Sequence, residues 1–180
     1  MVKVQELDLE AGVEATPIPP VEANVTRFVA GALTFGVEYR RLDSAVSRQN
    51  LELNRQQGRQ IAEDLGESQT EEAEGPSIHV FASDDGGEYL RFDCFDNEPH
   101  YHYIDPQRPW VNRLTFDPVA NGDMLSWTIA ALRSRLPQLL SRTDTGAALA
   151  ARVDLQQVQP VLDEVERCAR NVLTTPRNPE

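Results

Sequence analysis

The sequence has few positive charges and no long hydrophobic run. It contains 17 Lys and Arg residues against 29 Asp and Glu residues, which gives a formal net charge of −12 at pH 7. Such a chain is repelled by nucleic-acid phosphates and by anionic lipid surfaces, so we expect neither as a partner. No apolar run approaches the length of a membrane span, and residues 1–8 lack the basic start and apolar core of a signal peptide. We therefore expect a cytoplasmic protein.

Cysteine is also scarce. Cys94 and Cys168 lie far apart and form no Cys-x-x-Cys motif, which excludes a disulfide scaffold and favours two reduced, buried thiols. No Gly-x-Ser-x-Gly motif is present, so an activated serine is unsupported. The sequence therefore predicts no catalytic and no cofactor-binding residue, and it leans towards a protein that is not an enzyme.

The chain is long enough for one domain with a hydrophobic core. Residues 1–24 are acidic and contain several prolines, so we expect a flexible arm before a single domain over 25–180. Within that domain, composition favours a helix over 44–65 and an acidic linker over 66–76. The folded heart of the domain is expected at 77–142.

Several short segments have the composition of β-strands. Leu33–Tyr39 alternates apolar and polar residues, which is typical of a half-buried strand. Further strands, separated by turns rich in Gly, Asp, Asn and Pro, are expected at 77–82, 88–95 and 100–104. Leu114–Phe116 is a candidate short edge strand. These segments predict an antiparallel meander of three or four strands.

The C-terminal third carries two helical patterns. Apolar residues recur at spacings of three and four over 123–141 and again over 155–173. Pro137 is expected to bend the first helix or end it early, and Pro160 suits the first turn of the second, near Gln159. The predicted fold class is therefore α+β, with one face of the meander sheet covered by a C-terminal antiparallel helix pair.

All three histidines lie in the predicted meander, His79 at its start and His100 and His102 near its end. If residues 96–99 form a four-residue turn, Phe95 pairs with His100, Asp93 with His102 and Arg91 with Ile104, and these residues share one face. The other face then carries the more apolar set and is expected beneath the helices: Leu90, Phe92, Cys94, Tyr101 and Tyr103. Cys94 is therefore not expected to join the histidines.

The histidine face suggests a metal site. Two imidazoles of a His-x-His strand point the same way, and a carboxylate or a third imidazole beside them would suit an open zinc or iron site. The candidate ligands are His100, His102, Asp93 and His79. Whether His79 joins the others depends on a bulge at Gly86 or Gly87, which would shift the register by one residue. Surface or structural histidines are the competing interpretation.

Aromatic residues crowd the segment between residues 89 and 127. Tyr, Trp and Arg concentrate binding energy at protein interfaces, although the same residues also form the cores of small sheets. Trp110 is expected to be the most exposed aromatic residue, and Trp110, Arg91 and Phe95 are the candidate partner-binding residues.

One stretch has a recognisable motif. Leu90-Arg-Phe-Asp-Cys-Phe95, followed by Glu98-Pro-His-Tyr-His-Tyr103 and by Asp117–Asp123 before the Trp127 helix, resembles a family of small uncharacterised bacterial proteins, a domain of unknown function. The resemblance covers residues 77–142. It implies that this stretch is the folded heart of a bacterial protein, and it implies no activity.

Two functions remain open from sequence. The favoured one is a non-enzymatic interaction or assembly module that binds a protein partner or a second copy of itself, because no complete site is present and the last helix carries a stripe that suits a partner helix. The alternative is a metal-binding enzyme or sensor, with zinc or iron at His100, His102 and Asp93.

Overall fold

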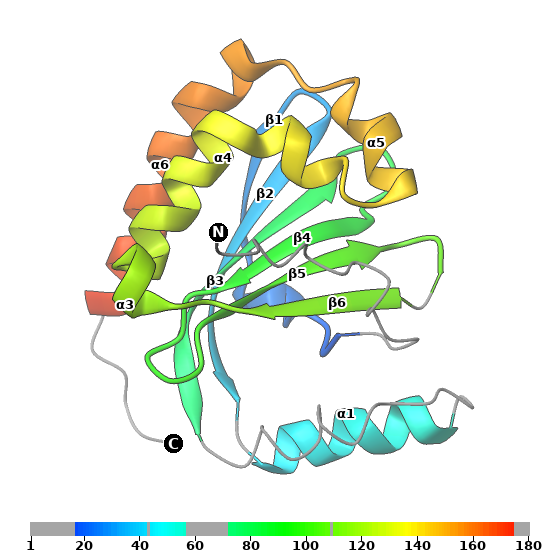
Figure 1. Ribbon diagram of the computed structural model, residues 1–180, viewed down its shortest axis with the longest axis vertical. Coiled ribbons are helices and arrows are strands. Elements are labelled where there is room, and N and C mark those ends of the chain that lie inside the picture. The colour runs from blue at the N-terminus through cyan, green and yellow to red at the C-terminus, as the bar shows by residue number, and fades with distance from the viewer. Residues whose placement is uncertain (1–16, 43, 57–71, 109, 175–180) are drawn as a thin grey trace, which may run out of the picture.

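The computed structural model describes residues 17–42, 44–56, 72–108 and 110–174. Its centre is one six-stranded antiparallel sheet in which every strand pairs with its neighbours in sequence (Figure 1). The strands are β1 (Thr26–Ala30), β2 (Leu33–Leu42), β3 (Ala73–Ala82), β4 (Glu88–Asp93), β5 (His100–Asp105) and β6 (Trp110–Thr115). The predicted α+β class and meander are confirmed, whereas the predicted count of three or four strands is wrong.

The two missed strands have different causes. In β1 only one of five residues is buried, so this edge strand lacks the alternation that marks a half-buried strand. β6 begins at Trp110, earlier than the candidate edge strand at 114–116, and its polar residues Asn112 and Arg113 hide its pattern. β3 begins at Ala73, so the end of the predicted 66–76 linker belongs to the sheet.

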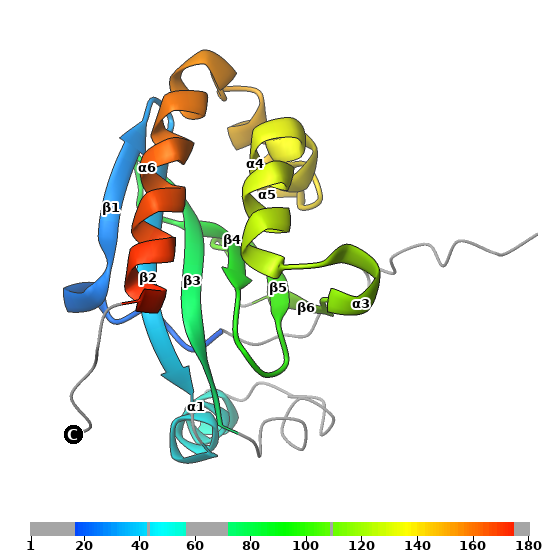
Figure 2. The same cartoon turned by 90° about the vertical axis from the view of Figure 1, so that its left-hand side faces the viewer.

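Helices cover one face of the sheet. The long helices α4 (Met124–Leu140) and α6 (Leu155–Thr174) run antiparallel across it, joined by α5 (Asp144–Ala150), and a short α3 (Pro118–Asn121) precedes α4 (Figure 2). α6 contacts β1, β2 and β3, and α4 contacts β4, as the predicted helix pair requires. α1 (Ser44–Gln56) lies apart from this layer, where β2 ends; the rest of the predicted 44–65 helix falls outside the described residues.

Pro137 does not end its helix early, and Pro160 does not lie in the first turn of its helix. α4 continues through Pro137 to Leu140, and α6 begins at Leu155, a turn before Pro160. A helical proline deprives the carbonyl four residues earlier of its donor, which for Pro137 is the carbonyl of Arg133. The side-chain Nε2 of Gln159 in α6 donates to that carbonyl at 2.9 Å and replaces the missing bond.

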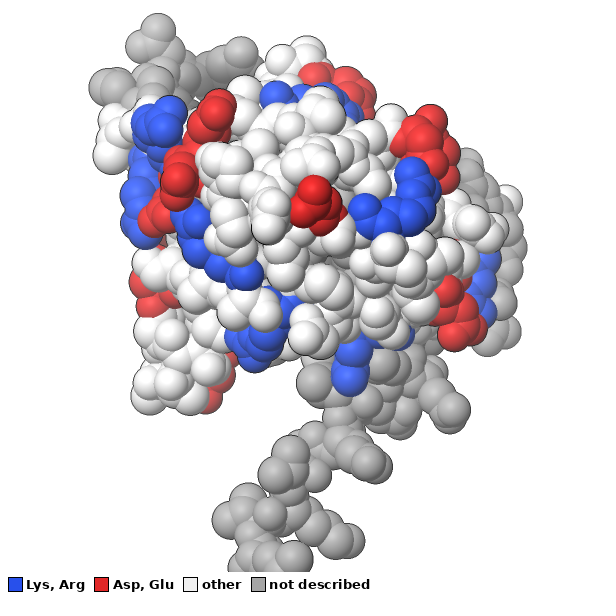
Figure 3. Space-filling model, turned by 90° about the horizontal axis from the view of Figure 1, so that it is seen from above, with Lys and Arg blue, Asp and Glu red and all other residues white. Residues whose placement is uncertain are grey.

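The end of the molecule near α5 and the start of α6 is largely uncharged. Seen from above, most charged side chains lie towards the rim of this surface, although an acidic side chain lies near its centre (Figure 3). The exposed residues of α5 include Ala147 and Ala148, and Leu155 at the start of α6 is also exposed. Among the helices that the structure describes, none combines the length and the apolar character needed to cross a membrane.

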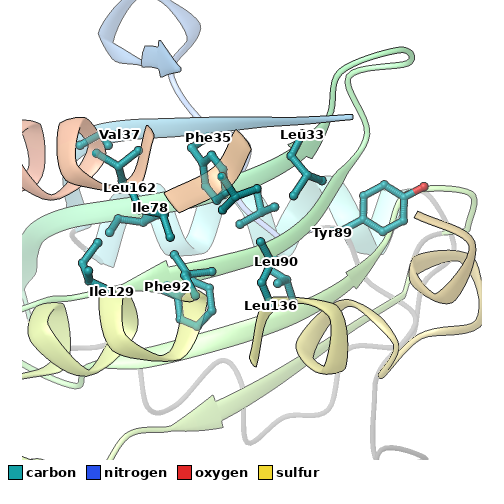
Figure 4. Close-up of a cluster of buried hydrophobic side chains, with 14 of the residues drawn as sticks. Leu33, Phe35, Val37, Ile78, Tyr89, Leu90, Phe92, Ile129, Leu136 and Leu162 are labelled. Atoms are coloured by element: carbon teal, nitrogen blue, oxygen red, sulfur yellow. The ribbon is translucent and has the colours of Figure 1, made fainter. Parts of the chain in front are cut away.

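The hydrophobic core fills the space between the sheet and the helices (Figure 4). β2 contributes Leu33, Phe35 and Val37, and the middle strands add Ile78, Leu90, Phe92 and Tyr103. The helices supply the opposing stripes, which were predicted from their spacing: Leu125, Ile129, Leu132 and Leu136 from α4, and Val158, Leu162, Val165 and Ala169 from α6. Burial of these side chains, each contributing about 1.5–3 kcal/mol, fixes which face of the sheet turns inward.

The register of β4 and β5 differs by two residues from the predicted one. Asp93 lies opposite His100, and Arg91 lies opposite His102, because residues 94–99 form a longer connection than the expected four-residue turn. A shift of two residues keeps every side chain on its face, since side chains alternate with a period of two. The predicted division of the two faces therefore holds although the predicted partners are wrong.

The N-terminal arm predicted at 1–24 is described only from residue 17. Glu22–Asn24 forms a 3₁₀ turn, and the residues before it lie against the sheet. Val21 donates its backbone N–H to Glu38 Oε2 at 3.1 Å, and the carbonyl of Ile18 accepts from Arg91 Nη1 at 2.6 Å. This part of the arm is therefore packed on the face opposite α4 and α6.

Candidate metal centre

Charged and polar side chains fill the face of the sheet that the helices leave uncovered. We call this set the polar face: Glu38, Arg40, Ser77, His79, Glu88, Arg91, Asp93, His100, His102 and Arg113. The strand register sets most of them in two adjacent rows across the sheet. The basic row consists of His79, Arg91, His102 and Arg113. The second row, which contains the acidic residues, consists of Glu38, Ser77, Asp93, His100 and Thr115.

The polar face is buried although it is charged. Arg91, Asp93 and Glu38 are each 1% exposed, and His79 is fully buried. Buried charges are tolerated only when they are paired and hydrogen-bonded. Because the two rows lie side by side, each of these side chains has a neighbour that is polar or carries the opposite charge.

Asp93 is the centre of one cluster. Its Oδ2 lies 3.2 Å from His100 Nε2 and 3.3 Å from His102 Nε2, while its Oδ1 accepts a hydrogen bond from Ser77 Oγ and lies 3.8 Å from Arg40 Nη1. Burial opposes ionisation of Asp93, but the contacts with the two histidines and with Arg40 hold its pKa well below the usual value. The group is therefore a carboxylate with one oxygen fixed and the other turned to the imidazoles.

The orientation of His100 leaves its Nε2 in need of a cation. His100 Nδ1 lies 2.6 Å from the carbonyl oxygen of Glu98, which can only accept, so Nδ1 carries a hydrogen. In a neutral ring the lone pair of Nε2 then faces Asp93 Oδ2 at 3.2 Å. Two lone pairs at this distance repel each other, and either a proton or a metal ion between them removes the repulsion.

His102 is suited to ligate a metal at neutral pH. Burial, opposed in part by Asp93, lowers the pKa of His102 to about 4, so its ring is neutral at pH 7. Its Nδ1 is buried and has no hydrogen-bond partner among the described residues. Metal ligation requires neutral imidazole, so this side chain would not have to lose a proton first.

The three donor atoms are spaced as metal ligands are. One donor atom each from Asp93, His100 and His102 lies within 4.8 Å of the others. Two ligands held about 2.0–2.1 Å from a tetrahedral ion lie roughly 3.3 Å apart, which matches the 3.2 and 3.3 Å contacts of Asp93 with the histidines. The hydrogen bond from His100 to the Glu98 carbonyl is the outer support that metal-binding histidines usually have.

His79 stands apart from this cluster. Its Nδ1 lies 2.6 Å from Glu88 Oε1, and its Nε2 lies 3.2 Å from Glu38 Oε1 without hydrogen-bond alignment. A register shift does occur, but not at Gly86 or Gly87 as the sequence suggested: Val80 faces Leu90, whereas Phe81 faces Glu88. Tyr89 is thus the extra residue of a bulge, and it places Glu88 on the polar face beside Arg91.

The candidate partner-binding residues are mostly enclosed. Arg91 is 1% exposed and forms a two-pronged ion pair with Glu88, at 2.8 and 2.6 Å. Phe95 is 5% exposed and packs edge-on against His100. Trp110 is half-buried beside the core, with the guanidinium of Arg108 over its ring. Their role in partner binding stays a prediction.

The thiol of Cys94 lies on the other face, as the alternation predicts. Its Sγ contacts Thr128 Oγ1 of α4 at 3.7 Å, and burial raises the pKa of Cys94 to about 12. A thiol with this pKa carries almost no thiolate at neutral pH, which disfavours it as a nucleophile.

Sequence reasoning missed the support of the cluster. Glu38, Arg40 and Ser77 come from β2 and β3, far from the histidines in sequence. Glu38 and Arg40 occupy the polar positions of a strand that alternates, and an alternating strand is typically solvated on its polar side. The signal that separates the two cases lies in the neighbouring strands, because β3 places Ser77 opposite Glu38 and β4 in turn places Asp93 opposite Ser77.

Most of the chain matches the model of a known protein family. A family model described as a domain of unknown function, DUF7700, matches residues 27–169. The chain belongs to the DUF7700 family. The match confirms the expected membership in an uncharacterised family, and it reaches from β1 into α6, well beyond residues 77–142. No curated protein and no solved structure matches the chain.

Proposed function

We propose that Asp93, His100 and His102 bind one divalent transition metal, zinc or iron(II), and that the protein acts through this metal as an enzyme or a sensor. The carrying observation is the buried Asp93 carboxylate, one oxygen of which lies 3.2 Å from His100 Nε2 and 3.3 Å from His102 Nε2. Three protein ligands leave at least one coordination position for another ligand, as in catalytic zinc and non-haem iron sites.

The experiment is a metal analysis of protein purified without an affinity tag and reconstituted with zinc or, without oxygen, iron(II). The wild-type chain is expected to hold about one equivalent after desalting, and the His100→Gln/His102→Gln variant less than a tenth. His79→Gln is the matched control, because it changes the third histidine of the same face and should leave the metal content unchanged. Wild-type protein with less than a tenth of an equivalent of either metal would overturn the proposal.

A second candidate function is self-association through β1. This strand pairs only with β2 among the described residues, so one edge of its backbone lacks a partner strand, and Val29 on it is 67% exposed. Exposed strand edges are templates for pairing with another chain, and a second copy would pair antiparallel across a two-fold axis. This candidate retains the interaction module favoured by the sequence.

Light scattering tests self-association. The wild-type chain is expected to form a dimer at high concentration, and Val29→Lys to form a monomer, because a charged edge residue opposes strand pairing. Val119→Lys is the control, since Val119 is 96% exposed and lies in α3, away from the edge. A wild-type monomer at millimolar concentration contradicts this second function and leaves the metal site untouched.

A further inference from the structure

Arg40 presents an unused donor beside the candidate metal centre. Its Nη1 is buried and has no hydrogen-bond acceptor among the described residues, and it lies 3.8 Å from Asp93 Oδ1. The side chain of Arg40 is 5% exposed. A buried donor without an acceptor destabilises the fold, and more so when it is charged, so this position calls for an acceptor.

The rest of the guanidinium is held in place. Arg40 Nη2 donates to the carbonyl of Ile18 at 3.1 Å, and Arg40 Nε lies 3.3 Å from Glu38 Oε1. The same Ile18 carbonyl accepts from Arg91 Nη1, so two guanidinium groups share one neutral oxygen. Pro19 and Pro20, which follow, have no backbone N–H to compete for these acceptors. Among the described residues, Nη1 of the Arg40 fork has no hydrogen-bond acceptor, and its contact with Asp93 Oδ1 is an ion pair at 3.8 Å.

The charges around the centre favour an anion once a metal is bound. Arg40, Arg91 and Arg113 face four carboxylates on or beside the polar face, those of Glu38, Glu88, Asp93 and Glu98. A divalent ion adds two positive charges, so the ion and the three guanidinium groups together exceed these four carboxylates by one charge. A buried excess of charge is costly unless a counter-ion accompanies it.

We propose that the open coordination position of the metal binds a small oxyanion, a carboxylate or a phosphate, and that Arg40 Nη1 donates to its second oxygen. The inference rests on the proposed metal site. Arginine suits this task because its planar donors match the spacing of two oxygens on one carbon or phosphorus atom. The ligand or substrate of the protein is then an acidic small molecule, although the chain itself is acidic overall.

The test uses full-length protein loaded with cobalt(II), whose visible spectrum reports the ligands of the metal. Sodium acetate and sodium phosphate are titrated separately at constant ionic strength, with sodium chloride as the reference salt. We expect a saturable spectral change with acetate or with phosphate, and the arm that responds identifies a carboxylate or a phosphate ligand. Arg40→Gln should still bind cobalt and should require at least tenfold more of that anion than the wild-type chain.

Two further variants keep the result decisive. Arg41→Gln changes the next residue on the opposite face, where Arg41 pairs with the exposed Glu72, and should behave as wild type. Arg40→Lys keeps the charge but loses the fork and should weaken anion binding, which serves the test if Arg40→Gln does not fold. Cobalt binding without any anion response, or an unchanged response in both Arg40 variants, overturns this inference alone. Failure to bind cobalt, zinc or iron(II) removes the metal site itself.

Discussion

Among single residues, Glu88 shows how the polar face is stabilised. Burial alone would raise the pKa of Glu88, but the charge of Arg91 and the hydrogen bonds from His79 and Arg91 outweigh it and lower the pKa to about 2. A carboxyl group whose pKa is lower in the folded state than in the unfolded state stabilises the fold above its unfolded pKa of 4.5. That stabilisation is lost as the pH falls from about 4.5 to about 2.

Replacement of Glu88 should therefore cost stability at neutral pH and remove part of the acid sensitivity. We expect Glu88→Gln to lower the free energy of unfolding by roughly 3 kcal/mol at pH 7, from a pKa shift of about 2.5 units, and by far less at pH 2.5. Urea unfolding at several pH values measures the difference. Equal losses at pH 7 and pH 2.5 would show that Glu88 acts through its shape rather than its charge.

The sequence placed the three candidate metal ligands on one face but did not predict their partners. Alternation alone places His100, His102 and Asp93 on one face, because it does not depend on the exact register. The pairing of Asp93 with His100 depends on the path of residues 94–99, which short-range rules for tight turns do not describe. The hydrogen on His100 Nδ1 depends on a backbone carbonyl, and no residue-type pattern encodes that contact.

For helices and strands, what the sequence predicts depends on burial. The stripes of α4 and α6 face the sheet and were predicted from spacing, whereas β1 is mostly exposed and carries no periodic signal. The course of α4 through Pro137 is set by a contact between helices, the Gln159 side chain on the Arg133 carbonyl. A rule that considers Pro137 alone predicts that α4 ends early, because such a rule does not include the hydrogen-bond donor that Gln159 of α6 supplies.

Loss of the Gln159 side chain should therefore destabilise α4. We expect Gln159→Ala to lower the free energy of unfolding by about 1–2 kcal/mol, because the Arg133 carbonyl loses its donor and Arg133 Nη1 loses the contact with Gln159 Oε1. Gln156→Ala is the matched control, since Gln156 is exposed on the same helix, and should change stability by less than about 0.5 kcal/mol. Equal effects in thermal or urea unfolding would argue against this account of Pro137.

In the molecule as a whole, one sheet separates two environments. The helical side is apolar and was predictable from composition and period, while the opposite side is charged and yet buried. Because the charged side is buried, a second layer of residues must cover it. The described residues 17–21 supply part of this layer through contacts with Glu38, Arg40 and Arg91. These contacts join residues far apart in the sequence, so no local sequence pattern predicts them.

Metal binding should stabilise the entire domain. A ligand that binds only the folded state adds about 2.7 kcal/mol when its free concentration is one hundred times its Kd. We expect zinc to raise the Tm of the wild-type chain and to leave that of Asp93→Asn unchanged, because the amide cannot neutralise the ion. Differential scanning calorimetry with and without a chelator measures both values. An equal rise in the two proteins would place the bound zinc elsewhere.

Every proposed ligand comes from the β4–β5 hairpin, between residues 93 and 102. Bringing these groups together closes only a short loop, so little chain entropy is lost before an ion can be captured. An ion bound during synthesis would hold the hairpin in register before α4 and α6 have left the ribosome. The metal would then serve first as a template for folding and only later as a reactive centre.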